Sequence, residues 1–136
     1  MGIILDADVI IRGERGTFDL GRWASSLPGE RLEIAAITAA QLFHGVERAT
    51  GANRAKRENF LRTVLEALPI IPYTEQTALL HARIWAALES LGQMIGYHDL
   101  IVAATALERG SSVATFNHRH FSQVPGLKVI VPAGAN

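Results

Sequence analysis

The chain has 136 residues, of which 49% are hydrophobic and 19% charged, and its 13 basic side chains equal its 13 acidic ones. This length fits one domain with a real core, and the composition excludes a disordered chain. Cysteine is absent, which excludes disulfides, thiol chemistry and cysteine-bound zinc. Because no basic stretch precedes an apolar run and no apolar run approaches 18 residues, we expect a cytoplasmic protein with no signal peptide and no membrane span.

The N-terminal segment Gly2 to Ile10 predicts a buried strand, because it is short, β-branched and almost continuously apolar. Two carboxylates, Asp6 and Asp8, interrupt the apolar run. Since side chains alternate along a strand with a period of two, we expect both carboxylates to point to the same side. A charge within an apolar strand is costly without a partner or a cation, so this segment is the first candidate for a functional site.

Helices and strands alternate along the rest of the chain. Thr38 and Gln41 match the capping-box pattern S/T-x-x-E/Q and predict a helix that begins there and runs to Arg48. The other predicted elements are a helix at 19–26, strands at 32–37 and 68–73, helices at 53–68, 74–92 and 99–110, and strands at 111–116 and 127–132. This order predicts an α/β fold, a mostly parallel β-sheet with helices on both faces, in one domain over residues 1–136.

Polar side chains gather at the junctions where the predicted strands end, and ligands of parallel sheets bind beyond the carboxyl ends of the strands. The candidate residues at these junctions are Asp6, Asp8, Gln41, Asp99 and Asn117. Each alone has a structural explanation, such as capping a turn or a helix N-terminus, but together they favour one site. Carboxylates without cysteine or a histidine cluster suit a hard divalent cation, Mg²⁺ or Mn²⁺, which would bind a phosphate substrate.

Four stretches of the sequence carry a resemblance to a known family. They are ILDADVIIRGERG, ITAAQLFHGVERA, IGYHDLIVAATALERG and TFNHRHFSQVPGLKV, and in this order they cover nearly the whole chain. The chain resembles the PIN-domain ribonucleases, and specifically the VapC toxins of bacterial toxin–antitoxin modules. The resemblance implies a PIN-like domain that acts as a metal-dependent endoribonuclease, the toxin of a type II toxin–antitoxin system, with Mg²⁺ or Mn²⁺ held by acidic residues.

The family's site residues carry over to this sequence with three departures. Asp6 and Asp99 match the first and third acids, but Gln41 stands where the family usually has Glu, and His120 stands where an acid often precedes Phe. Asp8 stands where Ser, Thr or Asn is usual. The resemblance implies a catalytic set in which Asp6 and Asp99 bind the metal and Asn117 assists.

Gln41 lacks the negative charge of Glu, and a neutral ligand should weaken cation binding. Our hypothesis is that Asp8 compensates as a third metal ligand, with Glu47 close by. The alternative is a catalytically weakened PIN-like module that binds RNA or an antitoxin without turnover.

The resemblance also implies partners. These are an RNA substrate, a VapB-type antitoxin that blocks the site with a C-terminal segment, and a second copy in a homodimer. Leu79, Trp85 and the apolar face around Phe60 are candidates for the protein–protein surfaces, although such apolar stripes also occur in cores.

A neutral chain needs a local basic patch to bind nucleic acid. Five of the 13 basic residues lie within 15 positions, namely Arg48, Arg54, Lys56, Arg57 and Arg62. We expect this cluster to follow the RNA backbone, and the alternative is a solvated helix face.

Two other enzyme classes share part of the N-terminal pattern. Asp6-Ala7-Asp8-Val9 fits the D-x-D-x-[TV] start of haloacid-dehalogenase phosphatases, but the only lysines are Lys56 and Lys128, and no later G-D-x-x-x-D is present. A receiver domain would need a phospho-accepting Asp after a middle strand and a Lys after the last one. Both requirements fail, so these classes are excluded.

Overall fold

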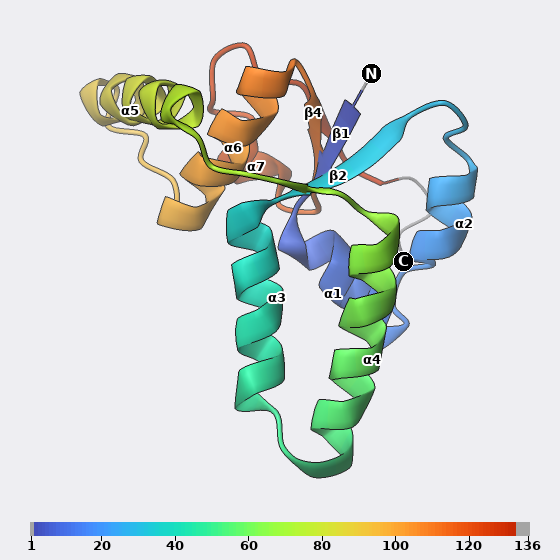
Figure 1. Cartoon of the computed structure of the whole chain (residues 1–136). Coiled ribbons are helices and arrows are strands. Elements are labelled where there is room, and N and C mark those ends of the chain that lie inside the picture. Colours follow the sequence, from blue (N-terminus) through green and yellow to red (C-terminus); the bar gives the residue numbers. More distant parts are fainter. Residues whose placement is uncertain (1, 133–136) are drawn as a thin grey trace.

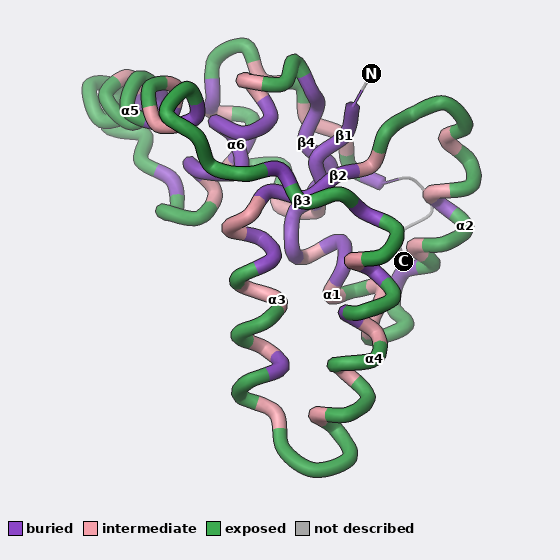
Figure 2. Tube along the Cα trace, in the orientation of Figure 1, coloured by how far each residue is buried: buried purple, intermediate pink, exposed green. Residues whose placement is uncertain are grey.

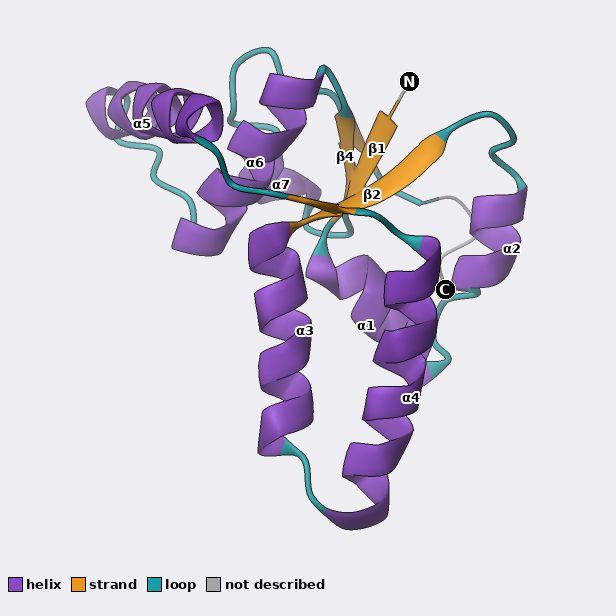
Figure 3. Ribbon diagram, viewed as in Figure 1, coloured by secondary structure: helices purple, strands orange, loops and turns teal. Residues whose placement is uncertain are grey.

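The computed structural model describes residues 2–132, and the two ends of the predicted 1–136 domain lie outside the described residues. Within this range one sheet of five parallel strands has the order β3-β2-β1-β4-β5 (Figure 3). The strands are β1 (Gly2–Leu5), β2 (Arg31–Ala35), β3 (Ile70–Ile71), β4 (Ser112–Ala114) and β5 (Val129–Ile130). The helices are α1 (Ala7–Arg15), α2 (Leu20–Ser25), α3 (Ala36–Arg48), α4 (Gly51–Ala67), α5 (Glu75–Ser90), α6 (Tyr97–Arg109) and α7 (His118–Phe121). This architecture confirms the predicted α/β fold.

Each face of the sheet is covered by its own hydrophobic core. Ile4 and Val113 pack with residues of α5, α6 and α7 on one face. Leu5 and Ala114, their chain neighbours, pack with residues of α1, α2 and α4 on the other. The alternation follows the period of two along a strand, and burial on both faces is typical of parallel sheets (Figure 2).

The predicted strand at 2–10 is too long, because β1 ends at Leu5 and α1 begins at Ala7. Asp6 ends the strand by capping the helix, since its Oδ1 accepts from the Ala7 N–H at 2.8 Å. The apolar letters of this segment fit a strand or an amphipathic helix equally well. The expectation that Asp6 and Asp8 lie within a strand and point to the same side of it is therefore wrong.

The capping box predicted for Thr38 and Gln41 is also wrong. Helix α3 begins two residues earlier, at Ala36, and its N-cap residue Ala35 makes no side-chain hydrogen bond. Thr38 is fully buried within the first turn. The structure has a reciprocal capping pair at the start of α5 instead, where Thr74 and Thr77 bond each other's backbone N–H.

Helices α3 and α4 form an antiparallel hairpin that projects from the sheet, and its far end is exposed (Figures 1 and 2). The two helices are tied by polar contacts, because Arg57 Nη1 donates to the Gly45 carbonyl at 3.2 Å and Arg54 pairs with Glu47 at 2.9 Å. No helix in residues 2–132 is long and apolar enough to cross a membrane.

Candidate active site

The ends of β1 and β4 lie side by side and place their next residues, Asp6 and Thr115, in contact. The Asp6 N–H donates to the Ala114 carbonyl at 2.9 Å, which fixes the two strand ends together. Helices α1, α3 and α6 all begin at this carboxyl edge of the sheet (Figure 1). The edge is where parallel sheets bind their ligands.

Asp6 is a buried carboxylate, with 7% of its surface exposed. Its Oδ1 accepts from Ala7 N and its Oδ2 accepts from the Thr115 hydroxyl at 2.9 Å. Burial raises the pKa of Asp6 to about 6, and the negative charges of Asp8 and Asp99 add to the rise, whereas the hydrogen bonds to Thr115 and Ala7 oppose it. The ionised form of Asp6 is therefore costly until a positive charge comes near.

Asp8 reaches the same place from the first turn of α1. Its Oδ2 accepts from the Phe116 N–H at 3.0 Å and from the Thr115 hydroxyl at 3.4 Å. Its Oδ1 is buried and has no hydrogen-bond partner among the described residues. Burial raises the pKa of Asp8, and these hydrogen bonds limit the rise. Thus the structure does bring Asp6 and Asp8 together, through Thr115 rather than through strand alternation.

Asp99 lies in the first turn of α6 and is held by a histidine. Its Oδ2 is 2.9 Å from His120 Nδ1, and the Asn117 amide is 2.8 Å from the same ring nitrogen. Because an ionised carboxylate oxygen only accepts, the contact with Asp99 requires a proton on His120 Nδ1, the ring nitrogen that the Asn117 Nδ2 atom also approaches. His120 therefore orients the Asp99 carboxylate, and Asn117 contacts His120.

Gln41 lines a cavity of about 380 Å³ together with Ala7 of α1 and His98 of α6. Because Ala7 and His98 are chain neighbours of Asp6 and Asp99, the cavity adjoins the carboxylates. The Gln41 Oε1 atom is buried and has no hydrogen-bond partner within residues 2–132. Gln41 thus brings an unused acceptor to this edge of the sheet.

Glu47 does not join the carboxylates. A rise of 1.5 Å per residue places it about 9 Å beyond Gln41 along α3. Its exposed carboxylate accepts from Arg54 Nη2 at 2.9 and 3.3 Å. The expectation that Glu47 supports Asp8 is therefore wrong.

The site offers oxygen donors of the kind that a hard cation prefers, the carboxylates of Asp6, Asp8 and Asp99 and the amide of Gln41. In the described part of the chain, no three His, Asp or Glu side chains form a preformed metal site. Asp8 and Asp99 each accept a hydrogen bond, from the Phe116 N–H and from His120 respectively, and the third candidate ligand, Gln41, is neutral. The chemistry of the set still fits a hard cation, because the charge of Asp8 raises the pKa of the buried Asp6, and the Asp8 Oδ1 atom has no hydrogen-bond partner within residues 2–132.

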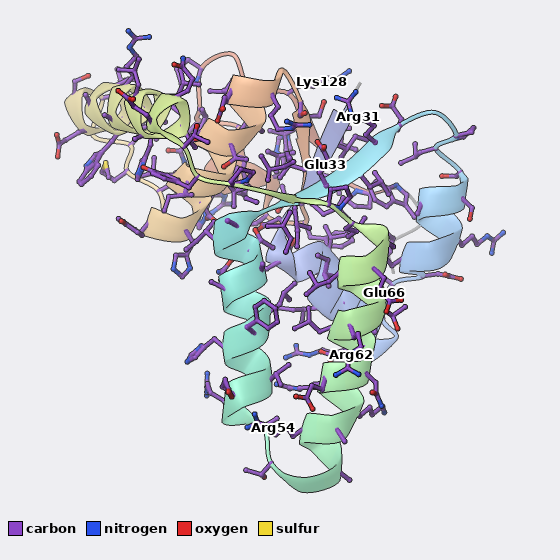
Figure 4. The ribbon with its side chains drawn as sticks, in the orientation of Figure 1. Arg31, Glu33, Arg54, Arg62, Glu66 and Lys128 are labelled. Carbon is purple, nitrogen blue, oxygen red and sulfur yellow. The ribbon has the colours of Figure 1, made fainter. Side chains whose placement is uncertain are left out.

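The predicted basic cluster is divided by the hairpin. Arg54 is neutralised by Glu47, and Arg62 lines a hollow with Glu47, Glu58 and Glu66. Figure 4 labels Arg54 at the far end of the hairpin and Arg62 beside Glu66 on α4. The remaining members are Arg48, Lys56 and Arg57, of which Arg48 and Arg57 line a different cavity. The five residues are not one continuous stripe.

Thr115 is the site residue that the sequence reasoning missed. Its hydroxyl contacts both Asp6 and Asp8 and accepts from the Asn117 N–H at 2.9 Å. The signal was its position as the first residue of T-F-N at the end of a predicted strand. A buried threonine in such a place is usually read as a strand residue.

A parallel sheet whose carboxyl edge gathers Asp6, Asp8 and Asp99 defines the class of protein. The PIN domain profile matches residues 3–127, so the chain belongs to the PIN-domain family.

Relatives narrow the class to the VapC ribonucleases. The chain is 33% identical over 131 residues to Ribonuclease VapC1 of Rickettsia felis, covering 96% of both chains. It is 31% identical over 106 residues to the tRNA(fMet)-specific endonuclease VapC of Salmonella typhimurium, covering 76% of this chain and 77% of that one. The chain is thus of the VapC type, the toxin ribonucleases of type II toxin–antitoxin systems.

Solved structures agree with this assignment. The DNA-bound VapBC of Salmonella typhimurium superposes with a TM-score of 0.86 at 26% identity, over 95% of this chain and 96% of that chain. FitAB bound to a DNA fragment superposes with a TM-score of 0.82 at 27% identity, over 96% of this chain and 94% of that one. VapBC2 of Rickettsia felis, at 22% identity and a TM-score of 0.88, shares the fold.

Proposed function

We propose that this chain is a Mg²⁺- or Mn²⁺-dependent endoribonuclease that hydrolyses RNA phosphodiesters at the carboxyl edge of its sheet. The observation that carries the proposal is the pair formed by the buried Asp6 and the half-buried Asp8, which share the Thr115 hydroxyl. Burial raises the pKa of both carboxyls, and the charge of Asp8 raises the pKa of Asp6 further. A buried repulsive pair of this kind is expensive for the fold. A bound cation would offset the free-energy cost of placing the two carboxylates together, and the phosphate of an RNA substrate would bind to that cation.

Asp6, Asp8 and Asp99 would hold the cation, which when bound polarises the scissile phosphate and lowers the pKa of the attacking water. Thr115 is a positioning residue, because its hydroxyl fixes the Asp6 Oδ2 and Asp8 Oδ2 atoms. His120, in contact with Asn117, orients the Asp99 carboxylate through its Nδ1–H. The proposed catalytic set therefore includes Asn117 as an indirect member.

Gln41 would complete the set as a neutral oxygen donor facing the cavity beside Ala7. Asp8 would supply the charge that the glutamate usual for the family would give at position 41, and its Oδ1 atom, which has no hydrogen-bond partner among the described residues, supports this role. Asp8→Ser should then abolish Mn²⁺ binding measured by calorimetry on the folded chain. An unchanged affinity would reject the compensation.

The RNA strand would be held outside the carboxylates by the basic residues of the hairpin. The predicted contacts are Arg48, Arg54, Lys56, Arg57 and Arg62. Binding through such side chains should weaken as salt concentration rises, because phosphate contacts release counterions.

We also propose a VapB-type antitoxin as partner, since the similar solved structures are VapBC complexes. An apolar groove between α2 and α4, lined by Leu20, Ala24, Phe60 and Val64, would receive an apolar segment of that antitoxin. A homodimer would form through α5, where Leu79 and Trp85 are both more than 40% exposed. The apolar character of these two surfaces supports the assignments.

The deciding experiment is cleavage of total cellular RNA by the purified chain with Mg²⁺, Mn²⁺ or EDTA, beside an Asp6→Asn control. Cleavage that needs the metal and is absent from the control is the expected result. A folded chain that binds RNA but does not cleave it, and that gains cleavage on Gln41→Glu, would favour the alternative of a weakened binding module.

A further inference from the structure

A second polar cavity of about 400 Å³ lies where the C-terminal end of α1 meets the turn of the hairpin. Three arginines from three helices line it, Arg15 of α1, Arg48 of α3 and Arg57 of α4, together with Thr50 and Asn53. No carboxylate is among its lining residues. Sequence reasoning could not group these arginines, because Arg15 is more than 30 positions from the other two.

The positive charges of the three arginines in this cavity are not neutralised by ion pairs among the described residues. In the part of the chain that the structure describes, Arg15, Arg48 and Arg57 form no ion pair with a carboxylate. Within residues 2–132, their one side-chain hydrogen bond runs from Arg57 to the Gly45 carbonyl, which fixes Arg57 against α3. Three guanidinium groups around one hollow give it a positive charge and present the fork-shaped donors that suit phosphate oxygens.

The arginine cavity neighbours two further hollows that extend toward the carboxylate site. A narrow hollow between α1 and α3 shares Arg15 and Arg57 with the arginine cavity, and it shares Ile11 and Gln41 with the cavity beside the carboxylates. The three hollows thus lie in a row along α1, which we call the groove, and its middle part is narrow, mostly apolar and also lined by Glu14. At 1.5 Å per residue, the nine residues from Asp6 to Arg15 span about 13 Å.

We propose that Arg15, Arg48 and Arg57 form a phosphate subsite for the RNA strand, in which a backbone phosphate remote from the scissile one is held at the far end of this groove. This inference rests on the proposed ribonuclease function and adds the path of the RNA strand, which would run along α1 between the hairpin and the carboxylates. The first turn of α4 adds its backbone N–H groups at the same end.

The occupant is RNA rather than an acidic peptide because the groove leads to the candidate site for phosphodiester hydrolysis. The cavity walls are polar side chains and backbone, with Thr50 and Asn53 beside the arginines. These groups match sugar and phosphate oxygens. A peptide with an apolar face would find its surface instead in the groove between α2 and α4.

The test measures binding of a fluorescent, mixed-sequence, single-stranded oligoribonucleotide to the full chain carrying Asp6→Asn, in EDTA, over a series of salt concentrations. The test variant adds Arg15→Ala and Arg48→Ala, two exposed arginines whose removal should not disturb packing. The matched control adds Arg22→Ala and Lys128→Ala, which remove the same charge from exposed positions outside the cavity and outside the five predicted RNA contacts. Circular dichroism confirms that both variants fold.

The test variant should lose affinity about tenfold at moderate salt, and its slope of log affinity against log salt should fall by about 1.4, the value for two phosphate contacts with a single strand. The control should keep both values near those of the parent. Equal losses in the two variants would overturn the proposal, because only net charge would matter. So would an equal loss of affinity for a poly-glutamate peptide, which would indicate an unspecific anion site.

A separate arm distinguishes this inference from the function beneath it. The Arg15→Ala/Arg48→Ala chain with Asp6 intact should cleave RNA with a raised KM and a nearly unchanged kcat. Metal-dependent cleavage with an unchanged KM would overturn the subsite alone. Absence of both cleavage by the unaltered chain and RNA binding by its Asp6→Asn form would overturn the ribonuclease proposal and the subsite with it.

Discussion

Thr115 donates its hydroxyl to the Oδ2 atom of Asp6 at 2.9 Å and so joins the ends of β1 and β4 across 109 positions of sequence. The Thr115 side chain is fully buried, and its oxygen also accepts from the Asn117 backbone N–H. One hydroxyl therefore positions a carboxylate and starts the turn that leads to Asn117 and His120. The Thr115 hydroxyl thus contributes both to the stability of the carboxyl edge of the sheet and to the position of the carboxylate there.

Replacing Thr115 by Val should lower the free energy of unfolding by about 1–3 kcal/mol, because the partners of a buried hydroxyl are left unsatisfied. Since the hydrogen bond lowers the pKa of Asp6, its loss should raise that pKa and move the acidic limb of the cleavage profile to higher pH. Chemical denaturation and a pH–rate profile measure the two effects. Thr115→Ser keeps the hydroxyl and should restore the profile, and an unmoved acidic limb in the Val variant would contradict the assigned role.

Asp6→Asn should make the metal-free chain more stable at neutral pH while it abolishes cleavage. Asp6 has its folded pKa raised to about 6 from 3.8, so the folded state holds the proton more tightly than the unfolded state. The stability that this proton contributes is fully present below about pH 4 and is lost as pH rises through about 6. At 1.36 kcal/mol per pKa unit, the ionised carboxylate then costs roughly 3 kcal/mol, which Asn avoids.

Thermal melting in EDTA at pH 4.5 and pH 7.5 measures this difference. The Asn variant should gain over the unaltered chain mainly at pH 7.5, and Mn²⁺ should raise the Tm of the unaltered chain far more than that of the variant. The same gain at both pH values would show that the Asp6 charge is not the cause.

The architecture could be predicted from the sequence because the patterns that define helices and strands are local. Alternating apolar runs and helix caps such as Thr74 gave most of the elements and the parallel sheet, which the structure confirms. Helix α1 was missed because ILDADVII reads as a strand until the capping bond of Asp6 to Ala7 is seen. Helix α7 was missed because four residues are too few for a periodic signal.

The candidate site was predictable in its residues but not in its contacts. Their positions at strand and helix ends predict the candidates Asp6, Asp8, Gln41, Asp99 and Asn117, whereas the buried Thr115 reads as an ordinary strand residue. The bonds of Asp8 to Phe116 N–H and of Asp99 to His120 join residues 108 and 21 positions apart. Nothing local in the sequence specifies such pairs, since they depend on how β1, β4 and α6 pack.

Gln41→Glu should lower the Mn²⁺ concentration needed for half-maximal cleavage by about tenfold, equivalent to about 1.4 kcal/mol of binding free energy. The added carboxylate would occupy the cavity beside Ala7 and His98, close to the carboxylates. Without metal, the extra negative charge should raise the pKa of Asp6 further and lower the Tm at neutral pH. Cleavage titrated with Mn²⁺ and melting in EDTA provide the measurements, with the neutral Gln41→Met as control. A metal requirement identical to that of the unaltered chain would show that position 41 lies outside the cation's reach.

Arg109→Ala should destabilise the fold by about 3 kcal/mol while sparing the site chemistry. The Arg109 guanidinium donates from Nε and Nη2 to both oxygens of Glu33, at 3.1 and 2.7 Å, and Glu33 is only 4% exposed in the middle of β2 (Figure 4). Removing Arg109 leaves that buried carboxylate without its one ion-pair partner among residues 2–132, and the penalty is this uncompensated charge more than the lost attraction. The double variant Glu33→Leu/Arg109→Leu, which removes both charges, should therefore recover much of the loss in urea denaturation. If the single and double variants were equally unstable, the deficit would come from lost packing around β2 and not from the orphaned charge.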